Sequence, residues 1–244
     1  MRPIRFDHIA LAVPRLVDAQ AVLVGELGGE SAFGASSEAF RFWHWRYEGG
    51  GRLEVLEPAG EDGFLHRFLA ERGPGIHHVT FTVPSLVEAC DRARSHGYSI
   101  VGYDDSDPEW KEAFLHPREA LGIVVQFAEP GAPASGERPP RWQPPPGPAN
   151  PPPPVTMLGM RMCARSRERA DTQWGAIMQG ERATTADGAL VYRWPGSLLR
   201  IAVEIDPARG EGPIAIEYAS DRGPVLPDGP HPMLGAVFHH RSVD

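Results

Sequence analysis

The chain has 244 residues, of which 41% are hydrophobic, and its formal net charge is −8 at pH 7. This length predicts two domains, and the negative charge argues against a protein that binds nucleic acid or anionic membranes, since both need a basic face. No apolar run approaches the roughly 20 residues of a membrane-spanning helix. The N-terminal segment also lacks the apolar stretch of a signal peptide, so we expect a cytoplasmic protein.

Residues 4–58 predict the element order β-α-β-β-β. An apolar, β-branched strand over 4–13 precedes a helix with apolar residues at helical spacing over 14–27. Three more strands are expected near 30–33, over 39–47 and over 52–57. In the strand over 39–47, one face carries Phe40, Phe42, His44 and Arg46. The other face carries Arg41, Trp43, Trp45 and Tyr47.

Residues 76–128 repeat this order. The segment from His8 reads HIALAVPRLVDA and the segment from His78 reads HVTFTVPSLVEA, an offset of 78 − 8 = 70. Near the end of each copy, Glu54 matches Gln126 at an offset of 126 − 54 = 72. A duplicated structural unit explains both matches. The second copy predicts a helix over 85–96 and strands near 98–103, 111–115 and 122–127.

Proline runs at 144–146 and 151–154 predict a semi-rigid linker over residues 131–154. The linker separates a first domain, residues 1–130 with modules at about 4–58 and 76–128, from a second domain at 155–244.

The second domain contains a weaker third copy of the module. In this third copy Gly159 and Ala202 replace His8 and Glu54. The start of a fourth copy follows, in which Ile216 replaces His78, and the chain ends before that copy is complete. We therefore expect a degenerate, truncated domain without a metal site. Its expected role is structural: it covers the open side of the first domain or forms a homodimer.

Four polar residues stand at matched repeat positions: His8, Glu54, His78 and Gln126. One histidine on a strand is more often a hydrogen-bonded core residue, but four matched donors favour a metal site. Two imidazoles with a carboxylate and an amide oxygen suit one divalent ion, Zn²⁺, Co²⁺, Ni²⁺, Mn²⁺ or Fe²⁺. His77 is excluded from this set because strand side chains alternate between faces.

The segments DHIALAV (7–13), GIHHV (75–79), FLHP (114–117) and GIVVQ (122–126) resemble the vicinal oxygen chelate superfamily, which contains glyoxalases, bleomycin resistance proteins and dioxygenases. Within it, they resemble the methylmalonyl-CoA epimerases most. The resemblance implies an α+β fold in which paired βαβββ modules form a half-open mixed β-barrel around a metal. It also implies that the four matched donors are the metal ligands.

The chain departs from the epimerase-like pattern at the site. That pattern has glutamate at the position of Gln126, whereas here the one liganding carboxylate is Glu54. The family's base is a glutamate on the strand before the second ligand, and its nearest counterpart is His44. Carboxylate bases on both sides of the substrate are therefore not expected. His116, in the His-Pro turn, and Phe42 are expected to line the substrate pocket.

Our leading hypothesis is proton transfer next to the carbonyl of a small oxo- or acyl-type substrate, as in an epimerase, isomerase or glyoxalase-like lyase. The ion would stabilise an enediolate, Glu54 would take the proton or orient a metal-bound water, and His44 would return the proton from the opposite side.

Two alternatives remain. Two histidines and a carboxylate are also the ligands of Fe(II) oxygenases, so a ring-cleaving dioxygenase fits, with aromatic residues of the 39–47 strand beside its substrate. A non-catalytic small-molecule binding or resistance protein would use the same concave site. Metal content separates this binder from both enzymes.

Overall fold

The computed structural model describes residues 3–131, 142–144, 146–185 and 188–242, so residues 132–141 and 145 of the predicted linker lie outside the described residues. In chain order the elements are β1 (Arg5–Ala12), α1 (Leu16–Leu23), β2 (Glu30–Ser36), β3 (Phe40–Arg46), β4 (Arg52–Pro58), α2 (Phe64–Arg72), β5 (Gly75–Thr82), α3 (Leu86–Ser95), β6 (Ile100–Asp104), β7 (Trp110–Leu115), β8 (Val124–Pro130), β9 (Thr156–Ala164), α4 (Arg167–Ala170), the π-helix η1 (Asp171–Ile177), β10 (Glu181–Thr184), β11 (Leu190–Arg193), β12 (Arg200–Ile205), β13 (Gly212–Ala219) and β14 (Phe238–His240).

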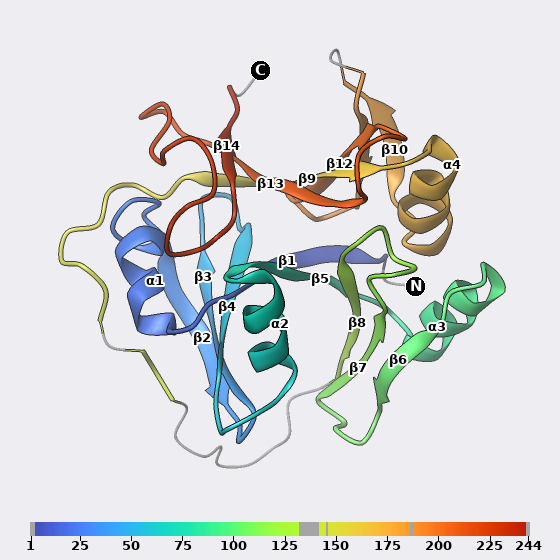
Figure 1. Cartoon of the computed structure of the whole chain (residues 1–244), viewed down its shortest axis with the longest axis horizontal. Coiled ribbons are helices and arrows are strands. Elements are labelled where there is room, and N and C mark those ends of the chain that lie inside the picture. Colours follow the sequence, from blue (N-terminus) through green and yellow to red (C-terminus); the bar gives the residue numbers. More distant parts are fainter. Residues whose placement is uncertain (1–2, 132–141, 145, 186–187, 243–244) are drawn as a thin grey trace. The chain divides into compact units, whose positions relative to one another are not determined.

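These strands form two mixed sheets (Figure 1). The strand order is β2-β3-β4-β1-β5-β8-β7-β6 in one sheet and β10-β11-β12-β9-β13-β14 in the other. Both predicted modules therefore have the expected β-α-β-β-β order, with β1 and β5 side by side. No described helix has the length and apolar content to span a membrane.

The chain divides into two compact units. One comprises Met1–His8, His78–Gly136 and Gly159–Ile214, and the other comprises Ile9–His77, Glu137–Leu158 and Ala215–Asp244. Each unit therefore joins segments from both sides of the predicted linker. The domain limits 1–130 and 155–244 remain predictions.

In the unit that contains β2, β3 and β4, the two faces of β3 meet different helices. Trp43 and Trp45 are buried, 3% and 0% exposed, and the neighbouring Tyr47 donates a hydrogen bond to the Leu23 carbonyl at the end of α1. Phe40 and Phe42, on the other face, pack against a cluster formed by Ala10, Ala12, Leu56 and Leu65. The tryptophans are thus core residues, and only the phenylalanines share a face with His44.

Helix α2 was not expected from the sequence, because it lies between the two repeats. Its apolar residues nevertheless have helical spacing: Leu65, Phe68 and Leu69 face the cluster with Ala10 and Leu56. The helix thus covers part of the sheet face that carries His44 and Glu54.

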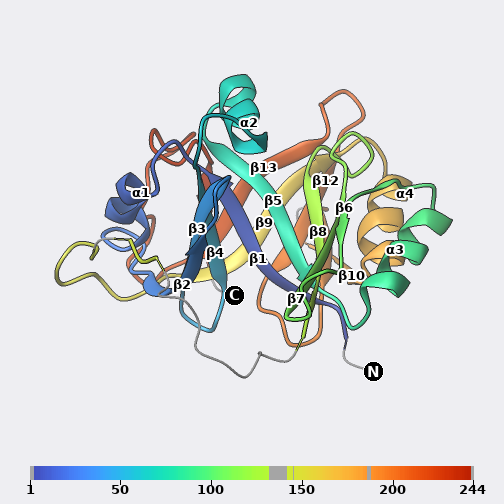
Figure 2. The ribbon, with the colours of Figure 1, turned by 90° about the horizontal axis from the view of Figure 1, so that it is seen from below.

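The other unit is built around α3 and an aromatic core. Ser85 caps α3 by accepting a hydrogen bond from the Glu88 N–H at 3.3 Å. Arg92 Nε, on α3, donates to the Ile177 carbonyl of η1 at 2.6 Å, and Figure 2 shows α3 beside the helical segment that begins with α4. Four aromatic rings pack nearby: Phe6, Phe81, Trp174 and Trp194. Helix α4 continues directly into η1, so most of this helical segment is a π-helix.

Strand register explains why the repeat alignment works. Ala10 pairs with Glu54 in the parallel ladder of β1 and β4, and Thr80 pairs with Gln126 in that of β5 and β8. The offsets are 80 − 10 = 70 and 126 − 54 = 72, equal to those of the sequence repeat. The matched donors therefore occupy equivalent ladder positions in the two modules.

The third copy keeps the same register without the donors. Arg161 pairs with Ala202 between β9 and β12, so Ala202 stands where Glu54 stands, and Gly159, two residues before Arg161, stands where His8 stands. Gly159 has a φ of +137°, and an added Cβ would lie 1.9 Å from the Arg200 carbonyl oxygen. A histidine side chain therefore does not fit at this position.

We predict that Gly159→Ala lowers the free energy of unfolding by about 1–3 kcal/mol or more, because alanine must adopt a strained backbone against a fixed carbonyl. Gly210→Ala is the matched control, since its Cβ would meet nothing within 4 Å. Urea titration of both variants measures the difference. Equal stability of the two variants would contradict the steric account of the missing donor.

Candidate metal centre

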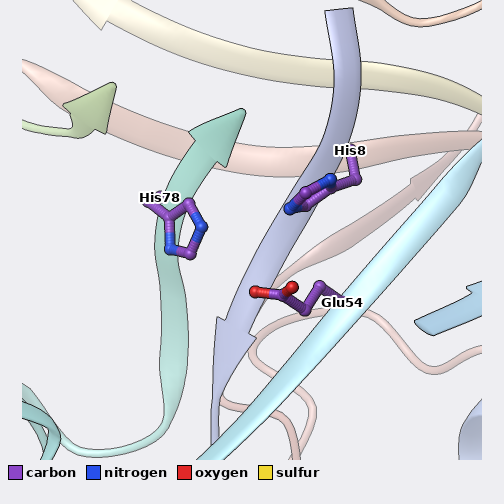
Figure 3. A group of neighbouring side chains, drawn as sticks. All are labelled: His8, Glu54 and His78. Carbon is purple, nitrogen blue, oxygen red and sulfur yellow. The ribbon is translucent and has the colours of Figure 1, made fainter. Parts of the chain in front are cut away.

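Three of the four predicted ligands cluster on neighbouring strands. His8 on β1, Glu54 on β4 and His78 on β5 each offer a ligand atom, and these atoms all lie within 4.8 Å of one another. Figure 3 shows the three side chains pointing toward one another. They are 2%, 7% and 6% exposed, and the rings of the two histidines are 6.0 Å apart between centroids. Burial of three polar groups so close together is costly unless they bind one another or an ion.

An aspartate holds the first histidine by its other ring nitrogen. Asp7 Oδ2 lies 2.8 Å from His8 Nδ1. A carboxylate accepts hydrogen bonds only, so this contact favours the proton on Nδ1 and leaves the Nε2 lone pair for an ion. This carboxylate–histidine arrangement is typical of metal-binding imidazoles.

We predict that Asp7→Asn weakens Zn²⁺ or Co²⁺ binding by about 10–100-fold, the usual effect of losing a partner that orients a metal ligand. The asparagine side chain can present its amide nitrogen to Nδ1 and so favour the wrong tautomer. Competition titration against a chromophoric chelator measures the affinity. Unchanged affinity would mean that Asp7 has no part in the site.

His77 is not among the clustered donors, and its ring packs against α2. Its ring lies 4.9 Å from that of Phe68 and 5.5 Å from that of Phe64, between centroids. Burial lowers the pKa of His77 to about 4, with a smaller lowering by Arg72 and an opposing effect of Glu54. At neutral pH this imidazole is uncharged.

The predicted catalytic pair, His44 and Glu54, are direct partners. The antiparallel register of β3 and β4 places the two residues opposite each other, and His44 Nε2 lies 2.8 Å from Glu54 Oε2. His44 therefore contacts Glu54 itself rather than standing on the opposite side of the substrate. The cross-strand pairing is the reason, because paired side chains on one face are neighbours.

A chain of aromatic rings leads from this pair toward α2. The Phe33 ring stacks on His44 at 4.3 Å, and Phe42 meets His44 edge-on at 5.6 Å, between centroids. Phe40 continues the chain to Phe64 at 5.6 Å. Phe33 and Phe64 are 37% and 40% exposed. Ring contacts thus run from His44 through Phe42, the predicted pocket residue, to Phe40 and α2.

The fourth predicted ligand, Gln126, is held from two sides. Its Oε1 accepts a hydrogen bond from Thr80 Oγ1, and its Nε2 donates to Glu112 Oε2, both at 2.6 Å. An amide oxygen has two lone pairs, so the bond from Thr80 leaves one for a metal. Ligation by Gln126 remains a prediction.

His116 begins a turn after β7. Its Nδ1 accepts a hydrogen bond from the Arg118 N–H at 3.2 Å, and its carbonyl accepts bonds from the N–H groups of Glu119 and Ala120 at 3.0 Å each. These bonds give it a structural role in the turn, and its place in a substrate pocket remains a prediction.

The sequence analysis missed Asp7 and Glu112. Asp7 immediately precedes the ligand His8, where a tautomer-fixing carboxylate could have been sought. Glu112 is two residues before Phe114, which pairs with Gln126, so strand alternation puts both on the face that carries Gln126.

The donors fit a divalent ion. Two imidazole nitrogens and one carboxylate, buried and mutually within reach, are ligands that Zn²⁺, Co²⁺, Ni²⁺, Mn²⁺ and Fe²⁺ all accept. The Asp7 contact supplies the orienting hydrogen bond that such a site uses.

Comparison with known proteins agrees with this fold, a pair of βαβββ modules. Residues 7–114 match the family described as Glyoxalase/Bleomycin resistance protein/Dioxygenase superfamily. The chain is 30% identical over 132 residues to the protein YqjC of Bacillus subtilis, covering 52% of this chain and 92% of YqjC. The chain belongs to the glyoxalase/bleomycin resistance protein/dioxygenase superfamily.

Two further proteins are similar. An ethylmalonyl-CoA/methylmalonyl-CoA epimerase of Cereibacter sphaeroides is 29% identical over 139 residues, which cover 51% of this chain and 97% of that enzyme. The solved structure of a mutant 4-hydroxymandelate synthase from Streptomyces coelicolor covers 91% of this chain and 72% of that one, with a TM-score of 0.65 and 18% identity. The second likeness concerns the fold alone, and it confirms the predicted α+β class of paired modules beyond the first domain.

Proposed function

We propose that this protein is a divalent-metal-dependent enzyme that transfers a proton on the carbon next to a carbonyl group, as an epimerase or glyoxalase-like lyase does. The observation that carries the proposal is the buried cluster of His8, Glu54 and His78, with His44 in contact with Glu54. Similarity to the Cereibacter epimerase over nearly its whole length supports the same reaction class.

His8, Glu54 and His78 would hold the ion, with Gln126 as a fourth ligand. When bound, a divalent ion withdraws electron density from a chelated substrate carbonyl and so acidifies the neighbouring C–H bond. Asp7 keeps His8 oriented, and all three ligands are buried.

Glu54 and His44 would move the proton. The α-C–H bond breaks, its electron pair shifts toward the carbonyl, and a Glu54 oxygen takes the proton. His44 Nε2, 2.8 Å from Glu54 Oε2, can share that proton and exchange it with solvent. Return of the proton to the same carbon completes an exchange. Because a carboxylate has two oxygens, Glu54 can bind an ion through one and contact His44 through the other.

The direct test is exchange of substrate protons with D₂O. Protein loaded separately with Zn²⁺, Co²⁺, Ni²⁺ or Mn²⁺ is incubated with 2-oxo, 2-hydroxy and acyl-CoA compounds, and deuterium incorporation at the α-carbon is followed by NMR. We expect incorporation with at least one ion and none after chelation. Absence of exchange with every ion would reject the proposal.

A ring-cleaving Fe(II) dioxygenase is the second candidate, because the rings of Phe33 and Phe42 contact His44, the partner of Glu54. Oxygen consumption by the Fe²⁺-loaded protein with a catechol, without α-proton exchange, would favour it. Tight binding of a small molecule without metal or turnover would favour the non-catalytic binding protein.

A further inference from the structure

Gln126 lies in a hydrogen-bonded network formed by β5, β7 and β8. Its Nε2 donates to Glu112 Oε2 at 2.6 Å, and the same oxygen accepts a second bond from Trp110 Nε1 at 3.1 Å. On the other side of the amide, Thr80 Oγ1 donates to Gln126 Oε1 at 2.6 Å. Gln126 is 7% exposed, so water competes little for these bonds.

This network fixes the orientation of the Gln126 side-chain amide. A carboxylate only accepts hydrogen bonds, so the Nε2 end of Gln126 must face Glu112. The Oε1 end then faces Thr80, which lies two residues after His78 and on the same face of β5. The amide oxygen, the only atom of Gln126 that can ligate a metal, is thus on the side of His78.

We propose that Glu112 is a positioning residue that fixes Gln126 with its oxygen toward the candidate metal centre, and that the two residues form a coupled carboxylate–amide pair. This inference rests on the proposed function, since it assumes a metal at His8, Glu54 and His78. It also accounts for the amide at position 126. A carboxylate there would stand 2.6 Å from that of Glu112, and two like charges at that distance repel.

The test is a double-mutant cycle of Glu112→Gln, Gln126→Glu and the combined swap, measured without turnover. The readouts are the thermal unfolding midpoint of the metal-free protein and Co²⁺ affinity by competition titration. Gln126→Glu alone should lower the midpoint, because it opposes two carboxylates. Glu112→Gln alone should weaken Co²⁺ binding about 10–100-fold, because the amide is no longer held in one orientation.

The swapped protein again has one carboxylate and one amide, so its midpoint should return toward wild type. Its Co²⁺ affinity should equal or exceed wild type, with a carboxylate as ligand. Glu129→Gln is the control: Glu129, on the same strand as Gln126, binds Lys111 and the Leu86 N–H, so Co²⁺ affinity should not change.

Additive effects of the two substitutions on both readouts would overturn the inference and leave the proposed function standing. Strong coupling in a protein that binds Co²⁺ but exchanges no α-proton with any ion would support the inference and reject the proposed function. A wild-type protein that binds no divalent ion would overturn both.

Discussion

Replacing Glu54 by glutamine is expected to lower the rate of α-proton exchange by about 10²–10⁴-fold, the contribution of a positioned general base. Glutamine keeps an oxygen of nearly the same position and can still ligate an ion, but it cannot take a proton. Metal content should therefore remain close to that of the wild type. Deuterium incorporation and elemental analysis of the same preparation measure the two effects separately.

Glu57→Gln is the matched control for this substitution. Glu57 lies on the same strand and is also buried, but its carboxylate accepts bonds from the Leu16 N–H and from Arg41. We expect this variant to keep its exchange rate once any loss of stability is corrected. Equal decreases in the α-proton exchange rate of the Glu54 and Glu57 variants would indicate a general structural effect. Glu54 would then not be the general base.

The second large effect concerns the adjacent histidines of β5. His78→Gln should weaken metal binding by more than the roughly 100-fold that follows loss of an orienting partner, because it removes a ligand itself. His77→Gln should leave the affinity nearly unchanged, because the His77 ring packs against Phe64 and Phe68 of α2 and is not part of the cluster. Titration with Zn²⁺ in the presence of a competing chelator distinguishes the two variants.

Both substitutions remove an imidazole from a largely buried position, so a difference between them reports ligation and not folding. Loss of binding in the His77 variant with retention in the His78 variant would reverse the assignment of the strand faces.

Much of the fold was predictable because residues matched by the sequence repeat also occupy matched positions in the strand pairing. The offsets of 70 and 72 hold in the Ala10–Glu54 and Thr80–Gln126 ladder pairs, so a match in sequence meant an equivalent position in space. The same reasoning predicted that the third copy lacks donors. Strand alternation favoured His78 over His77, and His78 is the one whose ring lies close to His8 and Glu54.

Other features depended on contacts that a repeat does not encode. Helix α2 lies between the copies, and its packing on Ala10 and Leu56 comes from the tertiary structure. Asp7 and Glu112 were not predicted, because the repeat identifies the candidate ligands His8 and Gln126 but not the residues that hydrogen-bond to them. His44 was expected across the substrate from Glu54, whereas the register of β3 and β4 makes the two residues neighbours.

The most direct test of the metal centre is anomalous diffraction from crystals of Co²⁺- or Zn²⁺-loaded protein, recorded at the absorption edge of the metal. We predict one strong peak per chain among the described residues, about 2.0–2.2 Å from a nitrogen of His8, a nitrogen of His78 and an oxygen of Glu54. A peak bonded to other residues, or its absence from crystals of protein shown to be loaded, would contradict the assignment.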